Sequence, residues 1–140
     1  MKYFPWISRR IRRIKIRRLR KSPNRREYVE QKETARALVE SRLLHWNKHY
    51  SFKYGRVSVR NQRSRWGSCS SKGNLNFNFR IVTLPIHIAD YIIVHELCHI
   101  GQFNHSEKFW NLVEETQPDY IKLQKELKKI SYQLLFLMSY

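Results

Sequence analysis

The segment His95-Glu96-Leu97-Cys98-His99, followed after five further residues by His105, gathers three imidazoles and a carboxylate in a short stretch of chain. Histidines four residues apart lie on one face of an α-helix, so His95 and His99 can converge on one metal ion. Glu96, beside the first histidine, would reach the open side of that ion and take a proton from water. The spacing predicts a zinc site with its own general base, which is the chemistry of a metalloprotease.

The predicted zinc-binding helix is apolar on nearly all sides, as a buried helix requires. Its apolar residues are Ile86, Ile88, Ala89, Ile92, Ile93, Val94, Leu97 and Cys98. His95 and His99 are therefore predicted to lie inside the protein. Buried ring nitrogens need partners, and a metal ion satisfies both rings at once. The alternative is a pair of hydrogen-bonded core histidines.

His105 can join the site only if this helix ends first, because a continuous helix would turn it by about 600° from His99. Gly101 is the expected helix stop, Asn104 tolerates left-handed geometry, and Ser106 can cap a following helix. Spacing and helix boundaries therefore agree on His105 as the third ligand.

Two other ligand patterns fit less well. Metzincins place a glycine where this chain has Gln102, and Met138 is too far along the chain for their methionine turn. A thermolysin-type site would instead use a glutamate about twenty residues beyond the second histidine. Glu114 and Glu115 are the nearest glutamates, and they rank below His105.

Four sequence blocks in order resemble the YgjP-like metallopeptidases, which are related to the SprT-like proteases. The blocks are Arg65-Trp66-Gly67-Ser68-Cys69, Asn74 to Arg80 leading to Leu84-Pro85, His95 to His99, and Asn104-His105-Ser106 with Phe109-Trp110. The resemblance covers roughly Val57 to Tyr120. It implies one Zn2+ per chain, with His95, His99 and His105 as ligands and Glu96 as catalytic base. It departs at the N-terminus, where this chain has a short arginine-rich segment in place of a longer β-rich one.

A β-hairpin is predicted around Gly73, with Asn74 to Arg80 as its second strand. The resemblance places this strand at the sheet edge, where an extended peptide can add as another strand. Its alternating pattern puts Leu75, Phe77 and Phe79 on one face. The residues of the other face are then predicted to bind substrate: Asn74, Asn76, Asn78 and Arg80. The alternative is an ordinary sheet whose polar face meets water.

The net charge of +17 is concentrated at the N-terminus, where residues 1–26 hold twelve lysines and arginines and no acid. The predicted organisation is a basic arm at residues 1–25 and a metallopeptidase domain at residues 26–140. Such an arm can bind a phosphate backbone or an anionic membrane surface, or it can serve only to keep the protein in solution. The candidate nucleic-acid-binding residues are Arg9, Arg10, Arg12, Arg13, Arg17 and Arg18.

Two cysteines, Cys69 and Cys98, offer no disulfide framework and fit a reducing compartment. No apolar run reaches the length of a membrane span, so a cytoplasmic protein is expected. Both cysteines are interpreted as small buried residues. The oligomeric state is left open.

Outside the zinc segment, a long helix is expected from about Arg26 to Tyr50, then short strands from Val57, a helix from Ser106 to Thr116 and another after Pro118. The expected fold is α+β: a minimal zincin-like metallopeptidase domain with a small twisted antiparallel sheet packed on helices.

Other polar and aromatic residues receive weaker interpretations. His45 and His49 repeat the spacing of a metal pair without a neighbouring glutamate, and they are expected either at the surface or behind the metal ligands. Arg63, Arg65 and Trp66 could clamp a phosphate or carboxylate, although a buried tryptophan is favoured. Candidates for a second oxyanion donor are Tyr120, Arg80 and His87.

The favoured function is a zinc-dependent peptidase with Glu96 as general base and a peptide or protein as substrate. One alternative is a nucleic-acid-binding protein with a structural zinc site, in which Cys69 would be the fourth ligand. Another is a SprT-like protease tethered to DNA through the basic arm.

Overall fold

The computed structural model describes residues 25–137, with side chains up to residue 134. The elements are α2 (Arg25–Tyr50), β1 (Val57–Arg60), β2 (Gly67–Cys69), β3 (Leu75–Asn78), the 3-10 helix η1 (Phe79–Thr83), α3 (Ile86–Gly101), α4 (Glu107–Thr116) and α5 (Tyr120–Leu137). The six arginines of the arm that are predicted to bind nucleic acid lie outside the described residues, as does Met138. The expected α+β class and the long first helix are confirmed.

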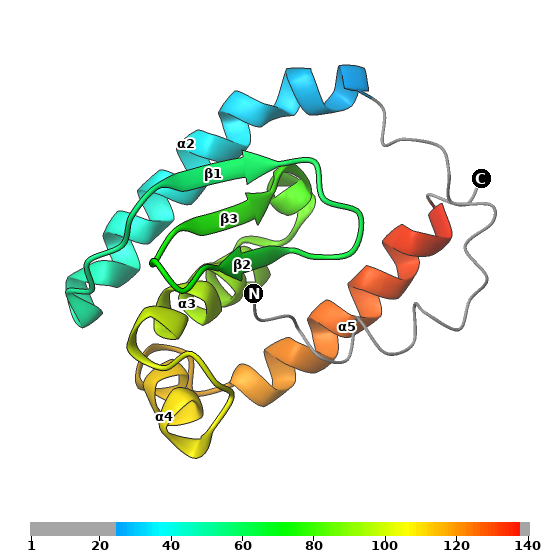
Figure 1. Cartoon of the computed structure of the whole chain (residues 1–140). Coiled ribbons are helices and arrows are strands. Elements are labelled where there is room, and N and C mark those ends of the chain that lie inside the picture. The colour runs from blue at the N-terminus through cyan, green and yellow to red at the C-terminus, as the bar shows by residue number, and fades with distance from the viewer. Residues whose placement is uncertain (1–24, 138–140) are drawn as a thin grey trace.

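The three strands form one sheet in the order β1-β3-β2 (Figure 1). β2 and β3 form the predicted antiparallel hairpin, in which Gly73 takes a φ of +77° at the turn. β1, however, runs parallel to β3, so the prediction of a wholly antiparallel sheet is wrong. Residues 61–66 connect β1 to β2 and leave a gap of one strand between them. β3, which follows β2 in the chain, fills this gap. The alternation of Val57 and Val59 predicts a strand but not its direction.

The prediction that Asn74 to Arg80 forms an edge strand is also wrong. β3 is the central strand and pairs on both sides, so it has no free main-chain edge for a peptide. The chain enters β3 directly from a tight hairpin with β2. β1 completes the other side of β3, which leaves β1 and β2 as the two edges.

The predicted polar face of this segment ends where the strand ends. Asn78 and Arg80 are buried, at 6% and 8% exposure, as are Leu75, Phe77 and Phe79. The Asn78 side chain accepts a hydrogen bond from the main-chain N–H of Arg80 and thereby caps η1. Strand alternation stops there, so Arg80 no longer shares a face with Asn74 and Asn76.

α3 is the central helix, and every residue from Ile88 to His99 is buried. It contacts α2, α4, α5 and β2, so its surroundings are protein on nearly all sides. This confirms the expectation from its apolar sequence. α2 packs on the same core through Ala35, Val39 and Leu43, which are spaced four residues apart.

Gly101 ends α3 for a different reason from the one expected. It is the last helical residue, and the next residue, Gln102, has an extended φ of −141°. A Cβ at position 101 would lie 2.8 Å from Cζ of Phe52 and 3.0 Å from Cδ1 of Leu112. The glycine therefore permits close packing of the helix end and not a left-handed turn. Ser106 does occupy the N-cap of α4, although its side chain makes no capping bond.

Among the described residues, no helix combines the length and the apolar character needed to span a membrane. Trp66 is buried as favoured, and its indole N–H donates to Oγ of Ser131 on α5 over 2.8 Å. This bond fixes the start of β2 against α5.

A partly buried ion pair ties α2 to α3. Nε and Nη2 of Arg42 donate to the two carboxylate oxygens of Asp90 over 2.6 and 2.7 Å. The two side chains are 26% and 10% exposed, whereas those of the Arg26–Glu30 pair on α2 are 84% and 59% exposed.

We expect Arg42→Ala to lower the free energy of unfolding by about 2 kcal/mol or more, because it leaves a buried carboxylate without its partner. Arg26→Ala is the matched control, since it removes the same side chain from the same helix at an exposed ion pair. Its expected cost is less than about 0.5 kcal/mol. Denaturant unfolding monitored by circular dichroism measures both values. Equal losses would contradict a structural role for the Arg42–Asp90 pair.

Candidate metal centre

Three histidine rings converge at the C-terminal end of α3. Nε2 of His95 lies 3.2 Å from Nε2 of His99 and 3.2 Å from Nε2 of His105. One ligand atom from each ring lies within 4.8 Å of the others. α3 supplies the first two rings, and the loop between α3 and α4 returns His105 to them. The structure thus brings together the three histidines that the sequence predicts.

The cluster has the dimensions of a metal site. In tetrahedral coordination at about 2.0–2.1 Å, zinc-bound nitrogens lie about 3.3 Å apart, close to the observed 3.2 Å. Burial, with the neighbouring rings of His99 and His105 adding to it, lowers the pKa of His95 well below its usual value. His95 is therefore neutral near pH 7, which is the form that binds metals.

The second ring nitrogen of His99 fixes its tautomer. Nδ1 lies 3.1 Å from the carbonyl oxygen of Gln102, which can only accept a hydrogen bond. Nδ1 must therefore carry the proton, and the lone pair of Nε2 faces the other histidines. Gln102, the residue after the end of α3, thus orients a candidate metal ligand on the preceding turn.

Aromatic rings from α4 and α5 position the histidines. Phe109 stacks on His99 with ring centroids 4.5 Å apart, and Trp110 stacks on His105 at 5.7 Å. Tyr120 in turn stacks on Trp110 at 4.9 Å. Phe109 and Trp110 belong to the fourth block of the family resemblance, but the sequence did not predict that they contact the histidines. The sequence feature that could have indicated this contact is their position, four and five residues after His105.

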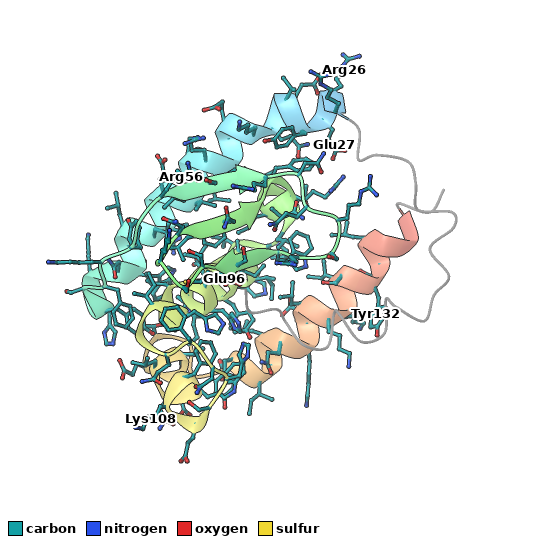
Figure 2. All side chains as sticks on the ribbon, in the orientation of Figure 1. Arg26, Glu27, Arg56, Glu96, Lys108 and Tyr132 are labelled. Carbon is teal, nitrogen blue, oxygen red and sulfur yellow. The ribbon has the colours of Figure 1, made fainter. Side chains whose placement is uncertain are left out.

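Glu96 follows His95 on α3, lies against Gly67 of β2 (Figure 2), and is 1% exposed. Its Oε2 has no hydrogen-bond partner in the structure. Burial raises the pKa of Glu96 well above its usual value, while the positive charge of Arg65 acts in the opposite direction. A buried carboxyl oxygen without a partner is costly and commonly marks a functional group.

β2 approaches Glu96 closely because it begins with a glycine. A Cβ at Gly67 would lie 2.8 Å from Cγ and 3.0 Å from Oε1 of Glu96. The sequence did not predict this role of Gly67, because no local pattern links Gly67 to Glu96. The glycine lets a strand lie directly over the candidate base.

The outer edge of β2 has no strand partner among the described residues. The N–H of Asn78 donates to the carbonyl of Trp66, and the N–H of Ser70 donates to the carbonyl of Asn74. Because alternate residues of an antiparallel strand bond to the same neighbour, the main-chain groups of Gly67 and Cys69 point away from β3. The edge beside Glu96 is therefore β2 and not the predicted β3.

The asparagines predicted to bind substrate make internal bonds. Nδ2 of Asn78 donates to the carbonyls of Gln62 and Arg65. Oδ1 of Asn74 accepts from the N–H of Arg56, and Nδ2 of Asn76 lies 3.4 Å from Oγ of Ser68. These contacts hold the loops around the sheet.

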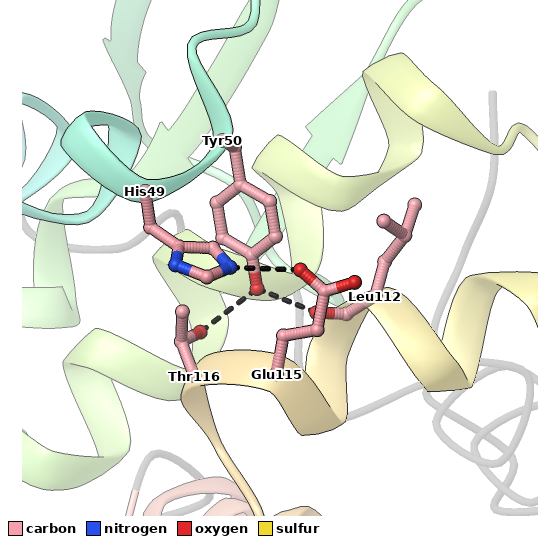
Figure 3. A network of polar contacts seen from close by, with 5 residues as sticks. All are labelled: His49, Tyr50, Leu112, Glu115 and Thr116. Carbon is pink, nitrogen blue, oxygen red and sulfur yellow. Dashed lines mark hydrogen bonds and ion pairs between the residues drawn. The ribbon is translucent and has the colours of Figure 1, made fainter.

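The other candidate residues lie away from the cluster or bond elsewhere. Nε2 of His49 lies 2.7 Å from Oε2 of Glu115, and the hydroxyl of Tyr50 donates to the carbonyl of Leu112 (Figure 3). Nε2 of His87 lies 2.8 Å from Oε1 of Glu126 at the surface, so this ring nitrogen already has a partner outside the histidine cluster.

Neither cysteine belongs to the metal-ligand cluster found among the described residues. Both are free and buried, as interpreted from the sequence. Burial raises the pKa of Cys98 to about 12, so its thiol stays protonated and does not act as a thiolate ligand. Without Cys69, the described cluster offers three protein ligands, as catalytic zinc sites do.

Comparisons with known proteins agree with this geometry. A family model described as the YgjP-like metallopeptidase domain matches residues 7–130. No curated protein matches the chain. The crystal structure of the metallopeptidase zymogen of Pyrococcus abyssi abylysin is similar, with a TM-score of 0.60, 23% identity, and coverage of 65% of this chain and 92% of that chain.

The crystal structure of the metallopeptidase zymogen of Methanocaldococcus jannaschii jannalysin is also similar. Its TM-score is 0.53 and its identity 24%, with coverage of 71% of this chain and 96% of that chain. At these identities the two structures establish the likeness of the fold, an α+β arrangement with a small sheet.

We expect the purified protein to bind about one zinc ion per chain, and His105→Ala to weaken that binding by more than about 100-fold, because it removes a ligand. His45→Ala is the matched control, since that exposed histidine on α2 lies outside the cluster. Elemental analysis and competition with a zinc chelator measure stoichiometry and affinity. Equal zinc affinity in His105→Ala and wild type would show that the third ligand lies elsewhere.

Proposed function

We propose that this chain, which belongs to the YgjP-like metallopeptidase domain family, is a zinc-dependent enzyme that hydrolyses peptide bonds. The observation that carries this proposal is the cluster of three converging histidines, with a buried glutamate, Glu96, directly after the first of them on α3. His95, His99 and His105 would hold the ion, which when bound would supply a Lewis acid for a water molecule and for the scissile carbonyl.

Glu96 is the general base of this proposal. Its partnerless Oε2 would accept a proton from the attacking water and then donate it to the nitrogen of the leaving amine. The raised pKa of Glu96 makes it a stronger base than an exposed glutamate. The enclosure of the carboxylate by α3 and β2 keeps bulk water from competing for the proton.

We propose that the substrate peptide lies along the outer edge of β2, which has no strand partner among the described residues. The main-chain groups of Gly67 and Cys69 point away from β3 there and would pair with an extended peptide. Gly67 contacts Glu96, so a peptide bound along this edge would have its backbone next to the base. This edge replaces the one expected at Asn74, Asn76, Asn78 and Arg80.

A second function, nucleic acid binding through the basic arm, is favoured by one observation. The chain carries a net charge of +17, and residues 1–26 contribute twelve of its 28 lysines and arginines. Together with the peptidase site, this charge supports the proposal of a protease tethered to nucleic acid. The free, buried cysteines support a reducing location such as the cytoplasm.

Glu96→Gln is expected to lower the kcat for a fluorogenic peptide about 10²- to 10⁴-fold, because it removes the general base and keeps the size of the side chain. Zinc content should stay at the wild-type level. Glu40→Gln is the matched control, since Glu40 is exposed on α2. Unchanged turnover in Glu96→Gln would refute the role assigned to Glu96.

Deletion of residues 1–22 is expected to weaken binding to duplex DNA roughly tenfold or more and to flatten its dependence on salt, since fewer phosphates are neutralised. Basal cleavage of a neutral peptide should not change. Fluorescence anisotropy across a series of salt concentrations measures the binding. If the shortened protein keeps the same DNA affinity and salt slope, the tether proposal is wrong.

A further inference from the structure

The sheet and its loops carry positive charge with no acidic residue among them. Residues 51–83 hold seven lysines and arginines and no aspartate or glutamate. Five of these basic residues are exposed, namely Lys53, Arg56, Arg60, Arg63 and Lys72. None of the ion pairs formed within the described part of the chain involves any of the five. Their charges therefore face solvent without an internal counterion.

Main-chain contacts bring two of these residues together at the start of β1. The N–H of Gly55 donates to the carbonyl of Gly73 over 2.9 Å, which holds the loop before β1 against the hairpin turn. A Cβ at Gly73 would lie 3.9 Å from the main-chain oxygen of Lys53. Because Lys72 directly precedes Gly73, the backbones of the two lysines are neighbours at this end of the sheet.

The other three residues continue the positive charge along β1. Arg56 directly precedes the strand, Arg60 ends it, and Arg63 follows in the next loop. Val59 is 4% exposed and faces the core, so the adjacent side chain of Arg60 points to the opposite side. At about 3.3 Å per residue, Arg56 and Arg60 lie about 13 Å apart along the strand. We call the five exposed basic residues the β1 basic stripe.

The helix that packs on β1 does not neutralise this stripe. α2 runs along β1 (Figure 1), and it contains four acidic residues. Three of the four already lie within 4.0 Å of arginines of the same helix: Glu30 beside Arg26, and Glu33 and Glu40 beside Arg36. The charge of α2 is thus largely balanced within the helix, and the stripe keeps its own.

The stripe and the proposed peptide edge lie on opposite sides of the sheet. β1 and β2 are the two outer strands, with β3 between them. β2 (Gly67–Cys69) contains no charged residue, whereas β1 ends in an arginine and follows one. At about 4.8 Å between neighbouring strands, the two edges are about 10 Å apart. A partner bound along β1 would therefore leave the edge of β2 open.

We infer that the β1 basic stripe binds the phosphate backbone of a nucleic acid, as a contact separate from the basic arm. A row of cations without counterions matches a polyanion whose charges repeat at short intervals, about one phosphate per 3.4 Å along each strand of a duplex. The 13 Å between Arg56 and Arg60 thus corresponds to about four phosphates. Guanidinium groups bind phosphate oxygens through paired hydrogen bonds. Such contacts hold a nucleic acid without reading its sequence.

The test removes the three arginines of the stripe together, as Arg56→Ala, Arg60→Ala and Arg63→Ala in the full chain. Binding to a labelled DNA duplex is measured by fluorescence anisotropy across a series of salt concentrations. Each phosphate contact contributes about 0.9 to the slope of the logarithm of affinity against the logarithm of salt concentration. We expect the slope to fall by about 2 to 3 and the affinity near physiological salt to fall about tenfold or more.

A second triple variant is the matched control, with Lys122, Lys125 and Lys129 replaced by alanine. These three lysines are exposed on α5, so their removal lowers the net charge by the same amount outside the stripe. Its DNA affinity should stay within about twofold of wild type, because long-range charge effects are screened near physiological salt. An equal loss in the two triple variants would show that only net charge matters and would overturn the inference.

The protein without residues 1–22 separates the stripe from the arm. The arginine substitutions should lower the remaining DNA affinity of this shortened protein as well. If they do not, the stripe is no independent contact and the inference is wrong. Edge-strand charges can also serve only to prevent association between sheets. Self-association of the arginine variant with unchanged DNA binding would therefore overturn the inference, as would arginine-dependent binding to phosphatidylserine vesicles in a protein that does not bind DNA.

The single substitution Arg60→Ala keeps the inference testable if the triple variant does not fold. Thermal melts identify the folded variants. Arg60→Ala should lower the salt slope by about 0.9, and its control Lys122→Ala should leave the slope unchanged. Equal slopes in these two single variants would overturn the inference. The measurements need neither zinc nor cleavage, so their outcome is independent of the proposed peptidase function.

Discussion

The burial of two histidines and a glutamate on a single helix is the constraint on which the rest of the structure depends. Every residue of α3 from Ile88 to His99 is buried, so its polar side chains cannot be satisfied by bulk water. Neighbouring elements supply partners: the loop before α4 brings His105 to His95, and the carbonyl of Gln102 accepts a hydrogen bond from Nδ1 of His99. Oε2 of Glu96 has no hydrogen-bond partner.

The packing around α3 explains why the site is precise. Stacking of Phe109 and Trp110 limits the rotation of His99 and His105, and the pair Arg42–Asp90 fixes α3 against α2. Gly67 lets β2 lie over Glu96 without a side chain in between. Three histidines that could hold a metal ion, with a buried carboxylate directly after the first of them, differ from a structural zinc site, which normally has four protein ligands. The arrangement therefore favours chemistry at the centre over a purely structural role.

Local patterns predicted the centre, and long-range packing decided the parts that the sequence could not predict. His95, His99 and His105 are close in sequence, so helix geometry and a helix end are enough to bring them together. The direction of β1 depends on its partner strand, which the alternation of Val57 and Val59 does not specify. For the same reason, the central place of β3 and the capping role of Asn78 were not predicted. The contact between Gly67 and Glu96 links two segments that share no local pattern.

Crystallography of the zinc-loaded protein at the zinc absorption edge tests the central claim most directly. The predicted result is one strong anomalous peak per chain, about 2.0–2.1 Å from Nε2 of His95, His99 and His105, with Glu96 beside it and no fourth protein ligand. The account would be contradicted if the peak showed a zinc ion bound by other residues, by a fourth side chain such as that of Cys69, or by Glu96 itself. These histidines and Glu96 would then not form the catalytic centre of a metallopeptidase as assigned.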